Sequence, residues 1–263
     1  MYLNNEQITR FLGTGAVNAD GDNLSAFLEK YNPNKYQNPS NTVDMLIFTY
    51  TEKEGVKTIS RLLLIKRGNH PSIGWWALPG GFVEYRENMD DAALRELKEE
   101  TGIEHVDMCQ LKSYGDYDRD PRTRIITTAY VALVPEGSLK AKAGDDASDS
   151  GWFEIEDRVE EADINSVSEQ DSLQSSKSCT AADGCGYCSK LHRLILREPS
   201  GNLELTADVE IKTRIGTILP KSEYRVINSN LLAADHGAII LEGYHFVKEQ
   251  IEKAQYQADK KRI

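Results

Sequence analysis

The feature that most constrains the fold is a change of pattern in the first half of the chain. Residues 59–67 (ISRLLLIKR) are rich in aliphatic side chains and predict a strand, and residues 68–81 form a loop dense in glycine and proline. A helix is then predicted at 88–101, with Asn88 as its N-cap and Gly102 just past its end. Strands mixed with a helix in this way predict an α/β fold.

Further strands and one more helix are predicted elsewhere in the chain. A Pro-Ser-Gly turn within 192–212 predicts a β-hairpin, and a long helix is predicted near 231–258. Residues 157–180 are acidic and rich in serine, which is typical of a linker. The additional predicted strands cover 42–51, 108–116, 124–134, 151–155, two stretches of 192–212, and 223–228.

These elements predict a chain of four parts. Residues 1–40 form an N-terminal extension, and residues 41–156 form a core of strands around the helix. Residues 157–230 form an insertion that begins as the acidic linker and continues as a β-rich segment with a cysteine cluster. Residues 231–263 form a C-terminal helix that packs on the core. A chain of 263 residues is long enough for a sizeable core.

Composition excludes several classes of protein. The formal net charge is −11 and the pI is near 5.0, which argues against a nucleic-acid partner. No apolar run approaches the roughly 20 residues that span a bilayer, and no signal peptide is visible at the start, so no membrane partner is expected. The 4 cysteines are too sparse for a disulfide scaffold. We therefore expect a cytoplasmic, reduced protein.

Three glutamates point to a metal-dependent reaction. Glu96, Glu99 and Glu100 are three or four residues apart, so a helix places them on one side. Their charges repel one another and lie near the helix C-terminus, where the helix dipole disfavours negative charge. A hard dication such as Mg²⁺ relieves that repulsion, since it is commonly held by carboxylates together with substrate phosphates. The alternative for so short a string is a solvated, glutamate-rich helix face.

Residues around the three glutamates support the metal interpretation. Gly80 and Gly81 let the backbone approach a phosphate or bend sharply towards the helix. Arg95 can reach Glu99 one turn later, or fold back on Glu87 in the loop. Either contact would orient a ligand carboxylate. Together these positions make a solvated helix face the weaker interpretation.

The stretch GGFVEYRENMDDAALRELKEETGI resembles the signature of the Nudix hydrolase superfamily at every fixed position, including Leu97 and Ile103. The resemblance implies an α/β/α sandwich with a mixed sheet, to which the insertion adds a β-hairpin. It also implies Mg²⁺-dependent cleavage of a nucleoside diphosphate joined to another group, with Mn²⁺ as a substitute ion. By resemblance, Glu96, Glu99 and Glu100 are metal ligands, and Glu87 and Arg95 support them.

Flanking motifs at 31–49, 75–84, 118–135 and 231–252 resemble a subgroup that contains ADP-ribose pyrophosphatases and related transcriptional regulators. The resemblance implies a homodimer that hydrolyses ADP-ribose to AMP and ribose 5-phosphate. Hydrolysis of a nucleotide sugar or of a damaged nucleoside triphosphate is the alternative. The regulators continue into a winged helix, whereas few residues follow His236 here, so we expect no DNA-binding role.

Other side chains are candidates for substrate contact or for proton transfer. Arg67, Arg122 and Arg124 can meet a diphosphate. Tyr114 or Tyr117 can stack on an adenine ring. Each of these has a purely structural role as its alternative. Two loop carboxylates, Asp145 and Asp146, are candidates for a metal contact or for the general base, with Glu100 as the other base candidate and a solvated acidic loop as the alternative.

The cysteine cluster leaves two interpretations open. Cys179, Cys185, Cys188 and His192 fall within one short stretch, and Cys-x2-Cys followed by histidine is compatible with structural Zn²⁺. The first spacing is unusual and a second cysteine pair is missing. A surface loop whose cysteines happen to cluster is therefore the alternative.

Overall fold

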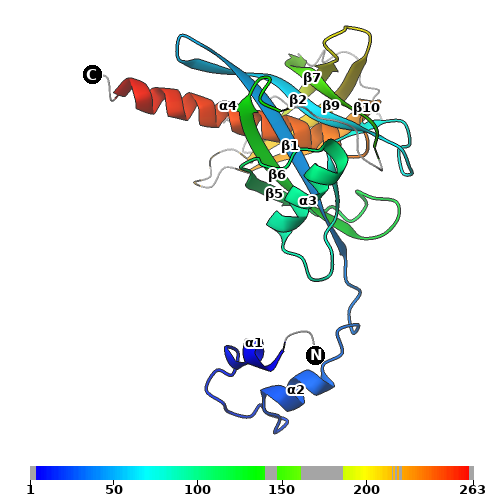
Figure 1. The fold of residues 1–263 in the computed structure, drawn as a ribbon, viewed down its shortest axis with the longest axis vertical. Coiled ribbons are helices and arrows are strands. Elements are labelled where there is room, and N and C mark those ends of the chain that lie inside the picture. The colour runs from blue at the N-terminus through cyan, green and yellow to red at the C-terminus, as the bar shows by residue number, and fades with distance from the viewer. Residues whose placement is uncertain are drawn as a thin grey trace. The chain divides into compact units, whose positions relative to one another are not determined.

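The computed structural model describes residues 4–139, 147–160, 186–214, 216, 218 and 221–260. The chain divides into two compact units, Met1–Pro39 and Ser40–Ile263, and each is described by itself. Figure 1 shows the path of the chain through both units.

The first unit contains two short helices, α1 (Asn5–Thr9) and α2 (Leu24–Lys30). The α1 helix starts with a capping box, in which the side chains of Asn4 and Gln7 each accept a hydrogen bond from the other's backbone N–H. The side chain of Asn23 caps α2 in a similar way. No residue of α2 is buried. Local capping, rather than an apolar core, therefore defines these helices.

The second unit is built on one sheet, which has ten strands among the described residues and the order β10-β9-β8-β7-β2-β1-β6-β5, with β3 beside β2 and β4 beside β1. The pairing of β1 with β6 is parallel and the other pairings are antiparallel. The predicted mixed sheet is confirmed. The strands are β1 (Ser40–Lys53), β2 (Val56–Arg67), β3 (Trp76–Ala77), β4 (Gly80–Phe82), β5 (Cys109–Tyr114), β6 (Ile125–Pro135), β7 (Ala147–Glu160), β8 (Tyr187–Arg197), β9 (Glu204–Arg214) and β10 (Ser222–Asn230).

Two helices cover this sheet. The α3 helix (Met89–Thr101) matches its prediction, and Gly102 takes the left-handed conformation that ends it, with φ of 71°. Asn88 is the N-cap residue as predicted, but its side chain donates to the Asp91 carboxylate instead of capping the backbone. The α4 helix (His236–Lys260) starts later than predicted, because residues 231–235 form a turn with Leu231 and Ala234 at positive φ.

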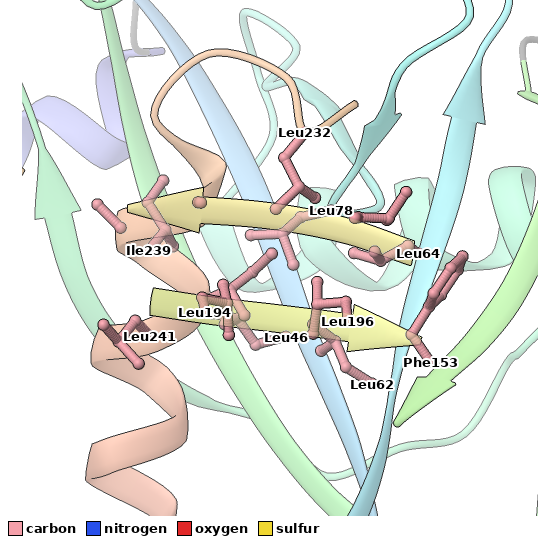
Figure 2. Packing of buried hydrophobic residues seen from close by; sticks show 14 of the residues in the cluster. Leu46, Leu62, Leu64, Leu78, Phe153, Leu194, Leu196, Leu232, Ile239 and Leu241 are labelled. Carbon is pink, nitrogen blue, oxygen red and sulfur yellow. The ribbon is translucent and has the colours of Figure 1, made fainter. Parts of the chain in front are cut away.

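Alternation along β1 separates the two layers of the core. Val43, Met45 and Ile47 face one side, where they pack with Ala92, Ala93 and Leu97 of α3. Leu46 and Phe48 belong to the other cluster, which includes residues of α4. Figure 2 shows Leu46 together with Ile239 and Leu241 of that helix. The predicted α/β/α sandwich is therefore confirmed. The residues labelled in Figure 2 on the α4 side are Leu46, Leu62, Leu64, Leu78, Phe153, Leu194, Leu196, Leu232, Ile239 and Leu241.

The segment after residue 156 is part of the same sheet. The first half of β7 pairs with β2 and its second half pairs with β8, where Asp157 lies opposite Leu194. The predicted linker is therefore wrong for residues 157–160, since pairing with β8 extends the strand despite its acidic sequence. The rest of the predicted linker up to residue 180 lies outside the described residues. The predicted hairpin is confirmed as β8 and β9, joined at a turn in which Gly201 has a φ of 75°.

Close backbone contacts place α4 on the sheet. A Cβ atom added at Gly237 would lie 2.6 Å from the Cβ of Ala207 in β9, and one added at Gly243 would lie 2.7 Å from a methyl group of Leu46 in β1. Glycine at these positions lets the helix approach two strands closely. Among the described helices, none is both long and apolar enough to cross a bilayer.

We expect Gly237→Ala to lower the free energy of unfolding by about 1–2 kcal/mol, because overpacking outweighs the better helix propensity of alanine. The partner Ala207 is buried within the sheet and cannot move away easily. Urea denaturation measures the change, and adding Ala207→Gly should recover part of the loss. Gly186→Ala is the matched control, since its added Cβ meets nothing within 4 Å. Equal stability of Gly237→Ala and wild type would contradict the packing described here.

Candidate active site

The site begins where β4 lies antiparallel to β1, with Gly80 opposite Asp44 and Gly81 opposite Val43. A Cβ at Gly80 would overlap the carbonyl oxygen of Val43, and a Cβ at Gly81 would overlap the carboxylate of Glu96. Only glycine lets β4 fit between the neighbouring strand and α3. The sequence predicts that this pair approaches a phosphate or bends the chain towards the helix, and in the structure the pair lies close to β1 and to Glu96.

Arg95 gathers the acidic residues at the surface of α3. Its Nε and Nη2 atoms donate to the two carboxylate oxygens of Glu87, at 2.7 and 2.8 Å. Its Nη1 atom donates to Glu96 at 2.7 Å and to Glu99 at 3.1 Å, and Nη2 also donates to the carbonyl oxygen of Phe82 at 3.0 Å. Both predicted contacts, to Glu87 and to Glu99, are therefore present. One guanidinium orients three of the carboxylates.

Glu100 and Glu96 lie where negative charge is poorly solvated. Burial raises the pKa of Glu100 to about 8, although Gly80 N donates a hydrogen bond of 2.6 Å to its Oε2 atom. The nearby carboxylates of Glu96 and Asp44 raise the pKa of Glu100 further. Burial also raises the pKa of Glu96, against the opposing effect of Arg95. A bound cation would stabilise the ionised form of both groups.

The donor set suits a divalent metal ion. Glu87 is engaged by Arg95, whose hydrogen bonds lower the pKa of Glu87 to about 2, so Glu87 is suited to support rather than to ligate. Glu96, Glu99 and Glu100 supply only oxygen atoms, the ligands that Mg²⁺ prefers. The Glu99 side chain is 59% exposed and therefore accessible to an ion from solvent. These three residues fit the predicted metal site.

A cavity of about 520 Å³ opens beside these carboxylates, a size that suits a small-molecule ligand. Glu96 and Glu100 line one part of it, and three arginines line another part: Arg67, Arg119 and Arg122. Carboxylates that can hold a metal and cations that can hold phosphate oxygens therefore line one cavity.

The arginines differ in whether their guanidinium groups are already paired with carboxylates. Arg67 donates its Nε to the carbonyl oxygen of Pro71 at 2.7 Å and forms no ion pair within the described part of the chain. Burial and the charge of Arg122 both lower the pKa of Arg67. Arg122 is paired with Asp120, and its guanidinium lies 5.3 Å from the ring centre of Phe82. Of these arginines, Arg67 is therefore the best placed to pair with a negatively charged ligand.

A network that the sequence did not predict completes the floor of the cavity. Thr127 donates to Asp44 at 2.6 Å, and the backbone N–H of Leu78 donates to Nδ1 of His236 at 2.9 Å. Because Nδ1 accepts that bond, the neutral ring carries its proton on Nε2, which lies 3.9 Å from Asp44. A lone aspartate in the apolar run 43–48 was the available signal.

Arg119 was also missed. Its guanidinium makes a two-bonded contact with Asp235, with both distances at 2.8 Å, and lies 4.0 Å from Asp44. The pair joins the loop before β6 to the turn before α4 and is 116 residues apart in sequence. Both residues lie within the flanking motifs at 118–135 and 231–252, but the spacing alone gave no reason to pair them.

Several predicted residues lie outside the cavity wall. Tyr117 is 81% exposed, and Arg124 is exposed beside the start of β1, where its carbonyl oxygen accepts from Ser40 N. Tyr114 donates its hydroxyl to Glu242 at 3.0 Å, so it is engaged with α4. The structure thus places none of the three in this wall. Asp145 and Asp146 lie outside the described residues.

Comparison with known proteins agrees with this geometry. The family model for the NUDIX domain matches residues 40–172. An ADP-ribose pyrophosphatase from Methanocaldococcus jannaschii is 41% identical over 128 residues, which cover 49% of this chain and 68% of that protein. The ADPR-responsive transcriptional repressor NtrR from Acinetobacter baylyi is 41% identical over 111 residues, which cover 41% of this chain and 42% of the repressor.

A solved structure extends the comparison to the whole fold. The crystal structure of a MutT/nudix family protein from Enterococcus faecalis is similar to this chain with a TM-score of 0.58 and 27% sequence identity. The similarity covers 95% of this chain and 76% of that chain. The likeness therefore includes strands that follow the region matched by the family model.

Replacing Arg95 by lysine should weaken binding of Mn²⁺ by about 10-fold or more, because an ammonium group cannot hold Glu87, Glu96 and Glu99 at once. Isothermal titration of the metal-free protein with Mn²⁺ measures the change. Arg193→Lys in β8 is the matched control, since Arg193 does not line the cavity. Unchanged Mn²⁺ affinity in Arg95→Lys would mean that Arg95 does not orient the ligands.

A second prediction concerns the stability of the metal-free protein. Folding raises the pKa of Glu100 from 4.5 to about 8, so the folded chain retains a proton that the unfolded chain releases. Wild-type stability therefore falls as the pH rises from about 4.5 to about 8 and then levels off. Glu100→Gln cannot ionise, so we expect it to unfold at higher urea than wild type at pH 8, with little difference at pH 5. Exposed Glu104→Gln is the control and should show no such gain.

Proposed function

The chain belongs to the Nudix family of hydrolases, which act on pyrophosphate bonds, and on this premise we propose that it hydrolyses ADP-ribose to AMP and ribose 5-phosphate with Mg²⁺. The observation that carries the proposal is that Glu96 and Glu100 line the same cavity as Arg67, Arg119 and Arg122. Water supplies the oxygen atom to one phosphorus, and the bridging P–O bond breaks, so the two products together contain the substrate plus one water.

The diphosphate of the proposed substrate gives the arginines of the cavity a role. The negative charge of the diphosphate needs cationic partners, and Arg67 lies near the carboxylates of Asp44, Glu100 and Asp120 but forms no close ion pair among the described residues. We assign Arg67 to a phosphate oxygen and Arg122 to the edge of the same group. Arg119 is held by Asp235, so we assign it the role of fixing the cavity wall rather than of binding.

The protein's own groups position the attack. When bound, Mg²⁺ neutralises phosphate charge and acidifies water. Glu96, Glu99 and Glu100 hold the ion, and Arg95 fixes the orientation of their carboxylates. Glu100 accepts from Gly80 through Oε2, which leaves Oε1 to take the proton of the attacking water. A bound cation would stabilise the ionised form of Glu100, which is the form that can accept a proton. Asp145 or Asp146 is the alternative base.

The same cavity would also accommodate related substrates. A nucleotide sugar or a damaged nucleoside triphosphate offers similar phosphate groups to Arg67. Mn²⁺ as a substitute ion, a homodimer and a cytoplasmic location remain predictions from the sequence. The similarity to NtrR makes an ADP-ribose-responsive regulator the second candidate.

The proposal predicts that ADP-ribose is turned over best in a Mg²⁺-containing panel with NADH, nucleotide sugars, dinucleoside polyphosphates and oxidised nucleotides. Chromatography should show AMP and ribose 5-phosphate in equal amounts. Glu99→Gln should lower kcat/KM by about 100-fold or more, because one metal ligand is lost. Glu104→Gln, on an exposed residue just after α3, should retain full activity.

Other results would redirect the assignment. Efficient turnover of another panel member without turnover of ADP-ribose would overturn the substrate but not the site. Full activity of Glu99→Gln would overturn the ligand assignment. Specific DNA binding that ADP-ribose relieves, without any turnover, would favour the regulator.

A further inference from the structure

A second polar cluster lies on the sheet face covered by α4. Asp157 of β7, His192 of β8 and His245 of α4 place their potential ligand atoms within 4.8 Å of one another. None of the three lines the catalytic cavity. Three separate elements meet at this cluster, so its geometry depends on the tertiary fold rather than on a local motif.

The contacts within the cluster are short. The Oδ1 atom of Asp157 lies 2.8 Å from Nδ1 of His192, and Oδ2 lies 2.7 Å from Nε2 of His245. The hydroxyl group of Tyr224 lies 3.1 Å from Nδ1 of His245. The side chains of His192, Asp157 and His245 are 10%, 13% and 27% exposed, so the cluster is mostly buried and opens to solvent at His245.

This position is unusual for polar groups. Leu194 and Leu196, which follow His192 on the same face of β8, are fully buried in the apolar core against α4. Apolar side chains would continue that core without the cost of burying a carboxylate. Burial alone would raise the pKa of Asp157, but hydrogen bonds from His245 and His192 lower it, so the carboxylate is ionised. The cluster therefore offers one anionic oxygen and two imidazole nitrogens.

We propose that Asp157, His192 and His245 form a second metal site, which binds a transition-metal ion such as Zn²⁺ and is separate from the glutamates of α3. Two imidazoles and one carboxylate are a ligand set typical of Zn²⁺, whereas Mg²⁺ prefers oxygen atoms alone. Metal–ligand distances of about 2.0–2.2 Å place tetrahedral ligand atoms about 3.4 Å apart. The two contacts of Asp157, at 2.8 and 2.7 Å, would therefore lengthen, while the two imidazole nitrogens, which lie within 4.8 Å of each other, would move towards that spacing. A fourth position remains for water.

Tyr224 supports the same ligand set from outside. With no ion bound, the Tyr224 hydroxyl donates to Nδ1 of His245, and Nε2 donates its proton to Asp157. Nε2 can ligate a metal only when the ring proton is on Nδ1, which then donates to the Tyr224 oxygen. A tyrosine hydroxyl can both donate and accept, so it accommodates either tautomer. Tyr224 is therefore a positioning residue for His245.

The structure also separates His192 from the cysteines with which the sequence grouped it. Cys188 lies four residues earlier on the extended strand β8, a distance of about 13 Å along the strand. One ion cannot reach both side chains across that distance. Cys179 and Cys185 lie outside the described residues. His192 thus belongs with Asp157 and His245 rather than with Cys188.

Co²⁺ titration in excess Mg²⁺ tests the site, because Mg²⁺ competes for the oxygen-only site while Co²⁺ absorbs visible light strongly when it is four-coordinate. We expect one Co²⁺ equivalent per wild-type chain, displaced by Zn²⁺. His192→Gln and His245→Gln should lose this signal, and Tyr224→Phe should bind Co²⁺ about 10-fold more weakly. His105→Gln is the matched control, since the His105 side chain is 95% exposed. Retained hydrolase activity in Mg²⁺ shows that each variant is folded.

Spectroscopy of the Zn²⁺-loaded wild-type protein keeps the test independent of any variant. X-ray absorption should show two imidazoles and oxygen, without sulfur. Sulfur ligands would place the ion at the cysteines, and oxygen ligands alone would place it at the glutamates, and either result overturns the proposal. So would wild-type Co²⁺ binding that His245→Gln leaves unchanged.

Discussion

The central strand β1 is the element on which the rest of the second unit depends. Its backbone pairs with β2, with β6 and, near its start, with the short strand β4. Its side chains at 43–49 are buried on both faces, whereas its two ends are partly exposed. Asp44 interrupts this apolar strand, and its charge is tolerated because Thr127, Arg119 and His236 surround it. The same strand thus supplies the core and the floor of the active site.

The candidate active site brings several carboxylates together, and the guanidinium of Arg95 reduces the repulsion among them. Arg95 contacts Glu87, Glu96 and Glu99, while Glu100 turns away to the backbone of Gly80. A guanidinium can satisfy several carboxylates because its donors lie in one plane. The negative charge that Arg95 leaves unpaired would favour a bound dication. Stability of the metal-free protein is therefore lower than the packing around α3 would allow.

Sequence patterns predicted those features that depend on neighbouring residues. The α3 helix, its terminal Gly102 and the glutamates along it repeat at helical spacing, and β1 and β2 are long apolar runs. Short β3 and β4 were missed, because two or three residues give no periodicity and only pairing with β2 and β1 defines them. The Arg119–Asp235 pair was missed for a related reason, since tertiary contact is not visible in spacing.

The same limit explains why the sequence grouped His192 with the cysteines. A spacing pattern can group only residues that are close in sequence, and His192 meets partners from β7 and α4. Acidic composition likewise suggested a linker at 157–160, where pairing with β8 makes a strand. In each case the deciding partner is distant along the chain.

Because β7 pairs with both β2 and β8, the outer strands β8, β9 and β10 cannot be removed as a separate domain. The first half of β7 pairs with β2, and the second half pairs with β8. A chain lacking residues 187–230 would leave half of β7 with a row of unpaired N–H and C=O groups. It would also expose the apolar side chains of α4 that pack against β9 and β10. Such an open edge beside an apolar face recruits other chains, so the shortened protein would aggregate rather than fold as a smaller enzyme.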